Sequence, residues 1–131
     1  MATSEVTAYF PCPVERVWQT VTDLAHTGWR SDLAGVEVLD EAHFVEHTKS
    51  GYATEFTVTA CEPTRYWAFT MANGNMCGSW EGRFEAVDGS TRLQCTETVH
   101  ARHWWMRPFV SGYLKRQQRR YLEDLRKKLL K

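Results

Sequence analysis

The feature that most constrains the fold is a run of short alternating segments between residues 33 and 101. Apolar and polar side chains alternate along these segments, as in β-strands with one buried face. Asn73-Gly74 and Asp88-Gly89 separate later segments, and both dipeptides favour tight hairpin turns. Because short hairpins join antiparallel neighbours, about six consecutive strands predict one antiparallel sheet.

The N-terminal segment predicts one more strand and two short helices. Residues 4–10 alternate, and Pro13 suits the first turn of a helix, where its missing N–H costs nothing. Helical spacing of apolar side chains supports that helix, at Val14, Val17, Trp18 and Val21. We expect Asp23 to cap a second short helix over Leu24 to Thr27, ended by Gly28.

The C-terminal segment predicts a long amphipathic helix. Pro108 can occupy its first turn, and about 22 residues at 1.5 Å each extend roughly 33 Å. The inward stripe is expected at Val110, Leu114, Gln117, Tyr121 and Leu125. The preceding stretch, residues 102–109 (RHWWMRPF), reads as the joint between the last strand and this helix. We expect one of Trp104 and Trp105 to pack inward and the other to lie nearer the surface.

Charge divides the chain into an acidic body and a basic tail. The formal net charge is zero, yet residues 1–101 contain 6 Lys/Arg and 14 Asp/Glu, whereas residues 102–131 contain 10 and 2. The basic face either complements the helix dipole and the acidic body or binds an anionic surface. We favour the first interpretation because the tail also carries the core-facing stripe, and we do not expect a nucleic-acid partner.

Composition and motifs exclude several classes. The chain lacks a nucleophile elbow, a phosphate-binding glycine loop and a dinucleotide fingerprint, and we expect no cofactor. Its four cysteines lack metal-binding spacing, so we expect no metal and free, buried thiols. The sequence has no apolar run of membrane-spanning length and no secretory signal, from which we expect a cytoplasmic protein.

Two patterns resemble the START-like, or SRPBCC, superfamily. One is PVERVWQTVTDL, from Pro13 to Leu24, followed closely by Trp29; the other is the proline-initiated helix that ends YLEDLRKKL, from Tyr121 to Leu129. The resemblance covers nearly the whole chain and implies a single α+β domain over residues 1–131. It implies a helix-grip fold, in which a curved seven-stranded antiparallel sheet surrounds the C-terminal helix and encloses a hydrophobic cavity. Both patterns are structural, so they do not identify a function.

On this fold the inward faces of the strands and helix define a candidate ligand site. The expected wall combines aromatic side chains with one amide: Trp29, Tyr52, Phe56, Trp67, Phe69, Trp80, Phe84, Tyr113 and Gln117. Gly78 and Gly82 flank Trp80 on the same face and either leave room beside the indole or mark a bulge. The alternative is an ordinary core in which the aromatics fill the grip.

Acid–base candidates are few. Glu97 falls on the apolar face of the last strand, where burial away from water would raise the pKa of its carboxyl group. Alternatively, a bulge turns its side chain outward, or water reaches this part of the inner face. His26 and Arg30 cluster near the expected mouth with Asp23 and Asp32. Glu97, His26, Arg30 and Tyr52 are the residues that an acid–base mechanism would have to use.

We therefore expect a carrier or binder of a small hydrophobic or aromatic molecule. The alternative is an enzyme like a polyketide cyclase or dehydratase, which needs an acid or base aimed into the cavity. The sequence is compatible with a homodimer, but no feature establishes one. It does not identify the ligand.

Overall fold

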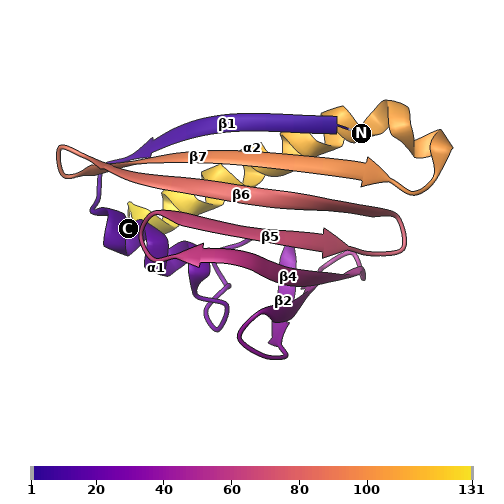
Figure 1. The fold of residues 1–131 in the computed structure, drawn as a ribbon, viewed down its shortest axis with the longest axis horizontal. Coiled ribbons are helices and arrows are strands. Elements are labelled where there is room, and N and C mark those ends of the chain that lie inside the picture. Colours follow the sequence, from indigo (N-terminus) through magenta and orange to yellow (C-terminus); the bar gives the residue numbers. More distant parts are fainter. Residues whose placement is uncertain (1, 131) are drawn as a thin grey trace.

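The computed structural model describes residues 2–130, which form a seven-stranded antiparallel sheet with a long helix across it (Figure 1). The strand order is β1-β7-β6-β5-β4-β3-β2. The elements are β1 (Ala2–Phe10), α1 (Val14–Thr22), β2 (Leu33–Val38), β3 (His43–Thr48), β4 (Ala53–Glu62), β5 (Tyr66–Ala72), β6 (Met76–Val87), β7 (Ser90–Ala101) and α2 (Arg107–Leu129). The expected α+β class, sheet and C-terminal helix are confirmed.

The tight turn between β6 and β7 forms where the sequence predicts it. Asp88 and Gly89 adopt φ angles of 50° and 80°, so both central residues of the hairpin occupy the left-handed region. That geometry matches the twist of the flanking strands and favours glycine at the second position. The hairpin aligns the two longest strands in regular register from Met76 to Val87.

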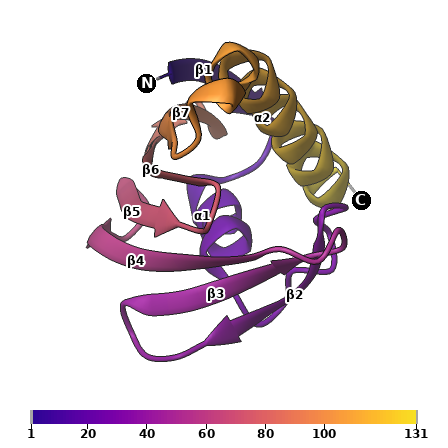
Figure 2. The same cartoon turned by 90° about the vertical axis from the view of Figure 1, so that its right-hand side faces the viewer.

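The sheet curves around the helix, as Figure 2 shows from the end of the molecule. Helix α2 packs mainly against β1 and β7, whereas β4, β3 and β2 lie on the opposite side of the enclosed space. Helix α1 contacts α2, β6 and β7 and fills one end of the grip. The helix-grip arrangement therefore leaves the other end without a covering helix among the described residues.

The prediction of a second short helix after β1 is wrong. Residues 23–28 contain turns and no helix. Asp23 follows the end of α1, and its carboxylate accepts a hydrogen bond from the Ala25 backbone N–H at 3.1 Å and contacts His26 Nδ1 at 2.9 Å. An aspartate that bonds two residues ahead makes a local turn, which competes with helix formation. The same preference that suggests a helix cap thus produces only a turn.

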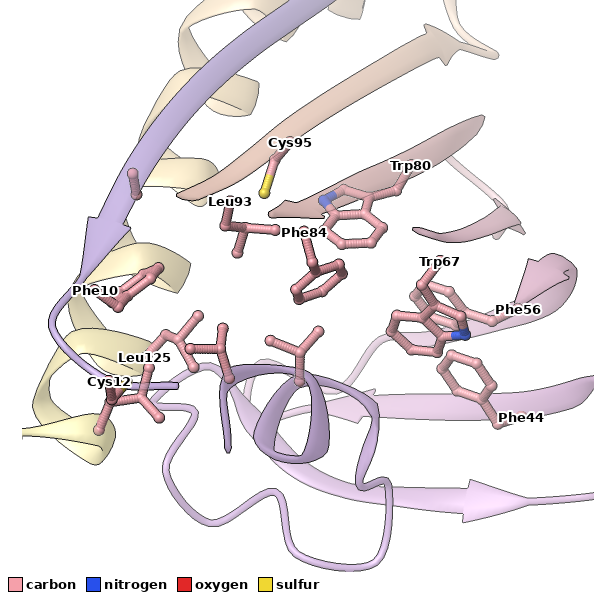
Figure 3. Close-up of a cluster of buried hydrophobic side chains, with 14 residues drawn as sticks. Phe10, Cys12, Phe44, Phe56, Trp67, Trp80, Phe84, Leu93, Cys95 and Leu125 are labelled. Atoms are coloured by element: carbon pink, nitrogen blue, oxygen red, sulfur yellow. The ribbon is translucent and has the colours of Figure 1, made fainter. Parts of the chain in front are cut away.

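The core gathers at the end of the grip that α1 fills. Phe10, Val17, Leu93 and Leu125 are among its most deeply buried side chains, and Figure 3 shows Phe10 and Leu125 beside each other. Trp67, Phe56 and Phe44 come from β5, β4 and β3; they belong to the same buried cluster and lie on its other side in the same view. The packed end and the aromatic end therefore use different parts of the sheet.

The buried side chains of α2 match the expected inward stripe only in part. Gln118, not Gln117, is buried, along with Val110, Leu114 and Leu125. Its amide Oε1 accepts a hydrogen bond from Ser4 Oγ at 2.6 Å, and its Nε2 donates to the Ser4 carbonyl at 3.0 Å. Gln118 thereby fastens α2 to β1, whereas Gln117 borders the cavity between the sheet and α2.

The expectation of four buried cysteines holds only in part. All four are free thiols; Cys12 and Cys95 are buried, Cys77 is half-buried and Cys61 is exposed. Cys61 lies near the end of β4, just after the register shift between Val58 and Ala60. An irregular strand end does not bury its side chains on the core face as a regular strand does.

Candidate functional site: a cavity between the sheet and helix α2

A cavity of about 960 Å³ lies between the concave face of the sheet and helix α2. Strands β3 to β7 contribute its walls, α2 covers one side, and the loop before β2 closes part of its edge. This volume falls at the upper end of the range for small-molecule sites in proteins. The grip is therefore open, not filled by its aromatic side chains.

A continuous set of rings forms one wall of the cavity. We call Phe44, Phe56, Trp67, Phe69 and Trp80 the aromatic wall. Phe44 stacks on Phe56 with ring centroids 4.7 Å apart, and Phe69 stacks on Trp80 at 5.1 Å. Edge-to-face contacts join the two pairs, including Phe56 to Phe69 at 5.1 Å. Because rings in such contacts hold one another in place, the wall is a preformed apolar surface.

Gly82 creates the position of Trp80. A Cβ atom at residue 82 would lie 2.4 Å from the indole ring of Trp80, closer than real contacts allow. The six-membered ring of the indole therefore occupies the room that a side chain at residue 82 would need. Gly78 serves a different need, since a Cβ there would meet the Thr98 carbonyl oxygen at 2.1 Å.

Three charged side chains form a largely buried cluster at the cavity edge, which we call the charged cluster: Arg30, Asp32 and Glu46. The Arg30 guanidinium donates to Glu46 Oε2 at 2.8 Å and to both carboxylate oxygens of Asp32 at 3.0 and 3.3 Å. Burial alone lowers the pKa of Arg30, but the charges of Glu46 and Asp32 raise it above its ordinary value. Arg30 also lies over the Tyr121 ring, 5.2 Å from its centroid. Arg30 is thus fixed in its charged form.

Glu97 faces the cavity from β7. Regular pairing opposite Trp80 and Ser4 shows that no bulge turns it outward. No hydrogen bond or ion pair within residues 2–130 connects its carboxylate to a partner. Burial raises its pKa to about 7, the charge of Glu46 adds to this shift, and Arg30 opposes it. At neutral pH Glu97 can therefore both take and give a proton.

Helix α2 covers the cavity with polar and aromatic groups. Tyr113, Gln117 and Tyr121 follow one another at helical spacing along its cavity side. Trp29 packs edge-to-face on Tyr121 with centroids 5.4 Å apart, and its indole Nε1 is buried without a hydrogen-bond partner among the described residues. Buried polar atoms are normally paired, so Trp29 contributes an unused donor beside the cavity.

The structure brings most of the expected site residues to this cavity. Eight of the nine expected wall residues border it: Trp29, Tyr52, Phe56, Trp67, Phe69, Trp80, Tyr113 and Gln117. Phe84 does not; it is buried in the core, with its ring edge-on to Trp18 at 5.0 Å. Phe84 shares the face of Trp80 but lies four residues along β6, where α1 fills the grip.

Three of the four acid–base candidates also border the cavity, and one does not. Glu97, Arg30 and Tyr52 border the cavity. His26 does not, because its side chain is 84% exposed in the turn after α1 and pairs with Asp23. The missing second helix removes the element that was expected to carry His26 to the mouth. Two cavity residues, Phe44 and Glu46, were not singled out from the sequence, although alternation along β3 places both on one face.

The mouth of the cavity lies between the start of α2 and the turns before β4 and β6. Tyr52, Trp105 and Phe109 border it and are exposed. The expectation that one of the paired tryptophans packs inward is wrong: Trp104 and Trp105 are 77% and 59% exposed. Both lie in a short 3-10 helix, Trp104–Met106, which turns the two side chains away from the core. Trp105 stacks on His103 and faces the mouth.

Residues 2–130 contain no group of three or more His, Cys, Asp or Glu side chains placed to hold a metal ion. No helix within the described part of the chain has the length and apolar composition needed to cross a membrane. The 23 residues of α2 are long enough, but they carry too many charges.

A family model described as polyketide cyclase/dehydrase and lipid transport matches residues 1–130. The chain belongs to this family. This membership confirms the START-like resemblance, and the family includes both ligand binding and cyclase activity without fixing either for a given member. No curated protein matches the chain.

Solved structures confirm the fold. A START superfamily protein from Mycobacterium smegmatis is similar with a TM-score of 0.87 at 12% identity, over 97% of this chain and 96% of that one. A conserved protein from Geobacillus kaustophilus gives 0.83 at 15% identity, over 98% and 95%. Zhui aromatase/cyclase from a Streptomyces species gives 0.83 at 18% identity, over 98% and 93%. At these identities the likeness concerns the fold alone.

Proposed function

We propose that this protein binds a small hydrophobic or aromatic molecule in the cavity between the sheet and helix α2. The supporting observation is the combination of a cavity of about 960 Å³ with the preformed aromatic wall. Flat rings that hold one another in place offer a planar apolar surface, and a ligand gains affinity when the surface needs no ordering. Membership in a family described by polyketide chemistry and lipid transport supports the same class of ligand.

The ligand has a polar group as well as an apolar body. Glu97 on β7 and Trp29 beside Tyr121 supply a carboxyl group and an N–H that have no partner within the described residues. The charged cluster satisfies Arg30 internally, so Arg30 mainly sets the local field. We expect the apolar body to lie on the aromatic wall and a hydroxyl or carbonyl group to lie toward Glu97.

Filling the cavity tests this function. Gln117→Trp places a large ring into the space from the covering helix, where Gln117 is only half-buried. We expect N-phenyl-1-naphthylamine, a probe that fluoresces in apolar sites, to bind the unaltered protein and to bind this variant at least about tenfold more weakly, a change of about 1.4 kcal/mol. A fluorescence titration gives both affinities.

Arg119→Trp is the matched control, because it adds the same ring to an exposed position of α2 that does not border the cavity. It should bind the probe as the unaltered protein does. Native mass spectrometry of the purified protein should also reveal any retained ligand. Equal probe affinity in the two tryptophan variants would contradict binding in this cavity.

A second function, cyclisation of a polyketide-like carbonyl compound, is favoured by the position of Glu97. Its pKa of about 7 suits a group that takes a proton from a carbon between two carbonyls. The resulting enolate carbon would form a bond to a second carbonyl carbon, and the protonated Glu97 would return its proton to the alkoxide. No external oxidant or cofactor is needed for this step.

The two functions differ in what Glu97→Gln does. For a binder, the variant still binds the naphthylamine probe and nothing else is lost. For an enzyme, a synthetic poly-β-ketothioester is converted by the unaltered protein and is left unchanged by the variant, while probe binding persists. Product analysis by mass spectrometry therefore separates carrier from catalyst.

A further inference from the structure

An exposed aromatic surface surrounds one side of the cavity mouth. We call Trp104, Trp105, Phe109 and Tyr113 the aromatic rim; they are 77%, 59%, 72% and 37% exposed. They lie within ten consecutive residues that span the 3-10 helix and the first turns of α2. Few soluble surfaces gather large apolar side chains so densely unless another apolar phase covers them.

The fold itself does not require these side chains. The joint between β7 and α2 needs a change of direction, which the 3-10 helix and Pro108 provide. The start of α2 is fastened instead by Val110 and Leu114, which pack against Val99 and Ala101. Phe109 and Trp104 contribute little to that packing because most of their surface meets solvent. The rim therefore calls for an explanation outside folding.

The segment that carries the rim has charges of one sign only. Residues 102–122 contain six Lys or Arg and no Asp or Glu, in a chain whose first 101 residues are strongly acidic. Arg107 lies between the tryptophans and Phe109, and Arg116 and Arg120 follow Phe109 and Tyr113 on the side of α2 that borders the cavity. Aromatic rings among cations match the interface of an anionic bilayer, where Trp settles at the headgroup level and Arg meets lipid phosphates.

We propose that the aromatic rim docks this protein on the surface of an anionic lipid bilayer. The rim lies in the interface without crossing it, with its rings among the upper acyl chains and Arg107, Arg116 and Arg120 against the headgroups. Docking in this orientation turns the cavity mouth toward the bilayer, because Trp105, Phe109 and Tyr113 border that mouth. An apolar ligand can then enter or leave without passing through water.

A second copy of the chain fits the rim less well. A symmetric contact brings the same patch from each copy together, and here that would oppose cations to cations. The acidic residues that could neutralise them lie in the body of the chain, not within residues 102–122. An anionic bilayer supplies both the missing charge and the apolar phase.

Vesicle binding tests the proposal with the full chain. We expect co-sedimentation with vesicles of phosphatidylcholine and phosphatidylglycerol, much weaker co-sedimentation with phosphatidylcholine alone, and a loss of binding as salt rises. Tryptophan emission should shift to the blue on binding, because Trp104 and Trp105 leave water. Absence of binding to anionic vesicles at low salt overturns the proposal.

Two pairs of matched variants locate the contact. Trp104→Ala with Trp105→Ala and Phe109→Ala should weaken vesicle binding at least about tenfold, whereas Tyr9→Ala with Leu39→Ala, exposed apolar residues outside the rim and the cavity lining, should not. Arg107→Gln with Arg116→Gln should weaken it more than Lys127→Gln with Lys128→Gln, which removes the same charge from the far end of α2. Equal binding within either pair overturns the docking surface.

Other occupants of the rim would produce different results. If the aromatic variant changes a dimer into a monomer in sedimentation equilibrium and vesicle binding is absent, the rim is an interface between copies. If a single-stranded oligonucleotide binds in a rim-dependent way and vesicles do not, the partner is a nucleic acid. Either result overturns membrane docking. Naphthylamine binding by the unaltered protein reports on the cavity without vesicles, so failure of docking is distinguishable from failure of the ligand site.

Discussion

The two halves of helix α2 perform different tasks although one amphipathic pattern runs through both. In the C-terminal half, Leu125 and Leu129 are buried in the main core, and Arg126 lies over the Phe10 ring. In the N-terminal half, one side packs through Val110 and Leu114, while Tyr113 on another side borders the cavity. Helix α1 packs in the same cluster as the C-terminal half, through Val17 and Val21. Whether an apolar stripe becomes core or cavity wall thus depends on what lies opposite.

The largest loss of stability is expected from a substitution in the C-terminal, packed half of α2. Leu125→Ala removes a fully buried side chain from the core and should lower the free energy of unfolding by about 2–5 kcal/mol, since neighbours only partly close the space. Urea unfolding followed by circular dichroism gives this value. Tyr113→Ala, in the open half, should change stability by less than about 1 kcal/mol because the cavity already lies beside it. Similar losses in both variants would contradict the division of α2.

The second effect concerns Glu97, whose buried carboxyl group makes the stability of the cavity side depend on pH. Burial raises the pKa of Glu97 to about 7 in the folded protein, above the ordinary glutamate value near 4.5, so the folded state binds its proton more tightly than the unfolded state does. The stability that Glu97 contributes through this tighter proton binding is fully present below about pH 4.5 and is lost as the pH rises through 7. Above pH 7 the charged carboxylate costs at most about 3 kcal/mol, at 1.36 kcal/mol per pKa unit.

Glu97→Gln should therefore stabilise the protein at pH 8 and have little effect at pH 5, as measured by thermal unfolding at both values. The groups that face Glu97 are Arg30 and Glu46 across the cavity, Tyr113 on α2 and Cys95 on its own strand. Glu55→Gln, an exposed carboxylate of β4, is the control and should leave stability nearly unchanged at pH 8. A destabilised Glu97→Gln protein at pH 8 would show that this carboxylate has a partner.

The smallest effect compares two adjacent amides. Gln118→Ala removes both hydrogen bonds to Ser4 and should cost about 1–2 kcal/mol, because the Ser4 groups lose their partners in a partly buried position. Gln117→Ala, one residue earlier but facing the cavity, should change the free energy of unfolding by less than about 0.5 kcal/mol. Urea unfolding of both variants decides which amide fastens the helix.

Sequence patterns predicted those parts of the fold that depend on local rules. Alternation placed Trp67, Phe69 and Trp80 on one inner face, and Asp88-Gly89 marked a hairpin that forms as expected. Alternation also placed Glu97 inward, where regular pairing holds it. Eight of nine expected wall residues border the cavity for the same reason: the period of a strand fixes which face a side chain occupies.

The sequence-based predictions differ from the structure where contacts between distant segments override a local preference. Asp23 has the chemistry of a helix cap, but it bonds to Ala25 and His26 in a turn. Phe84 follows the period of its strand, yet the packing of Trp18 from α1 makes that part of the face core. Gln117 borders the cavity as expected, but the sequence did not indicate that its neighbour Gln118 is buried, because contact with Ser4 of β1 decides this.

The sequence by itself determined the antiparallel sheet, the final helix and the faces of the strands, since turn chemistry and side-chain period act over a few residues. The tertiary structure alone decided that the cavity is open, that Arg30 pairs with both Asp32 and Glu46, and that Trp104 and Trp105 remain exposed. These features depend on segments that are far apart in the chain and meet only when the sheet curves around the helix. No local pattern encodes the space left between them.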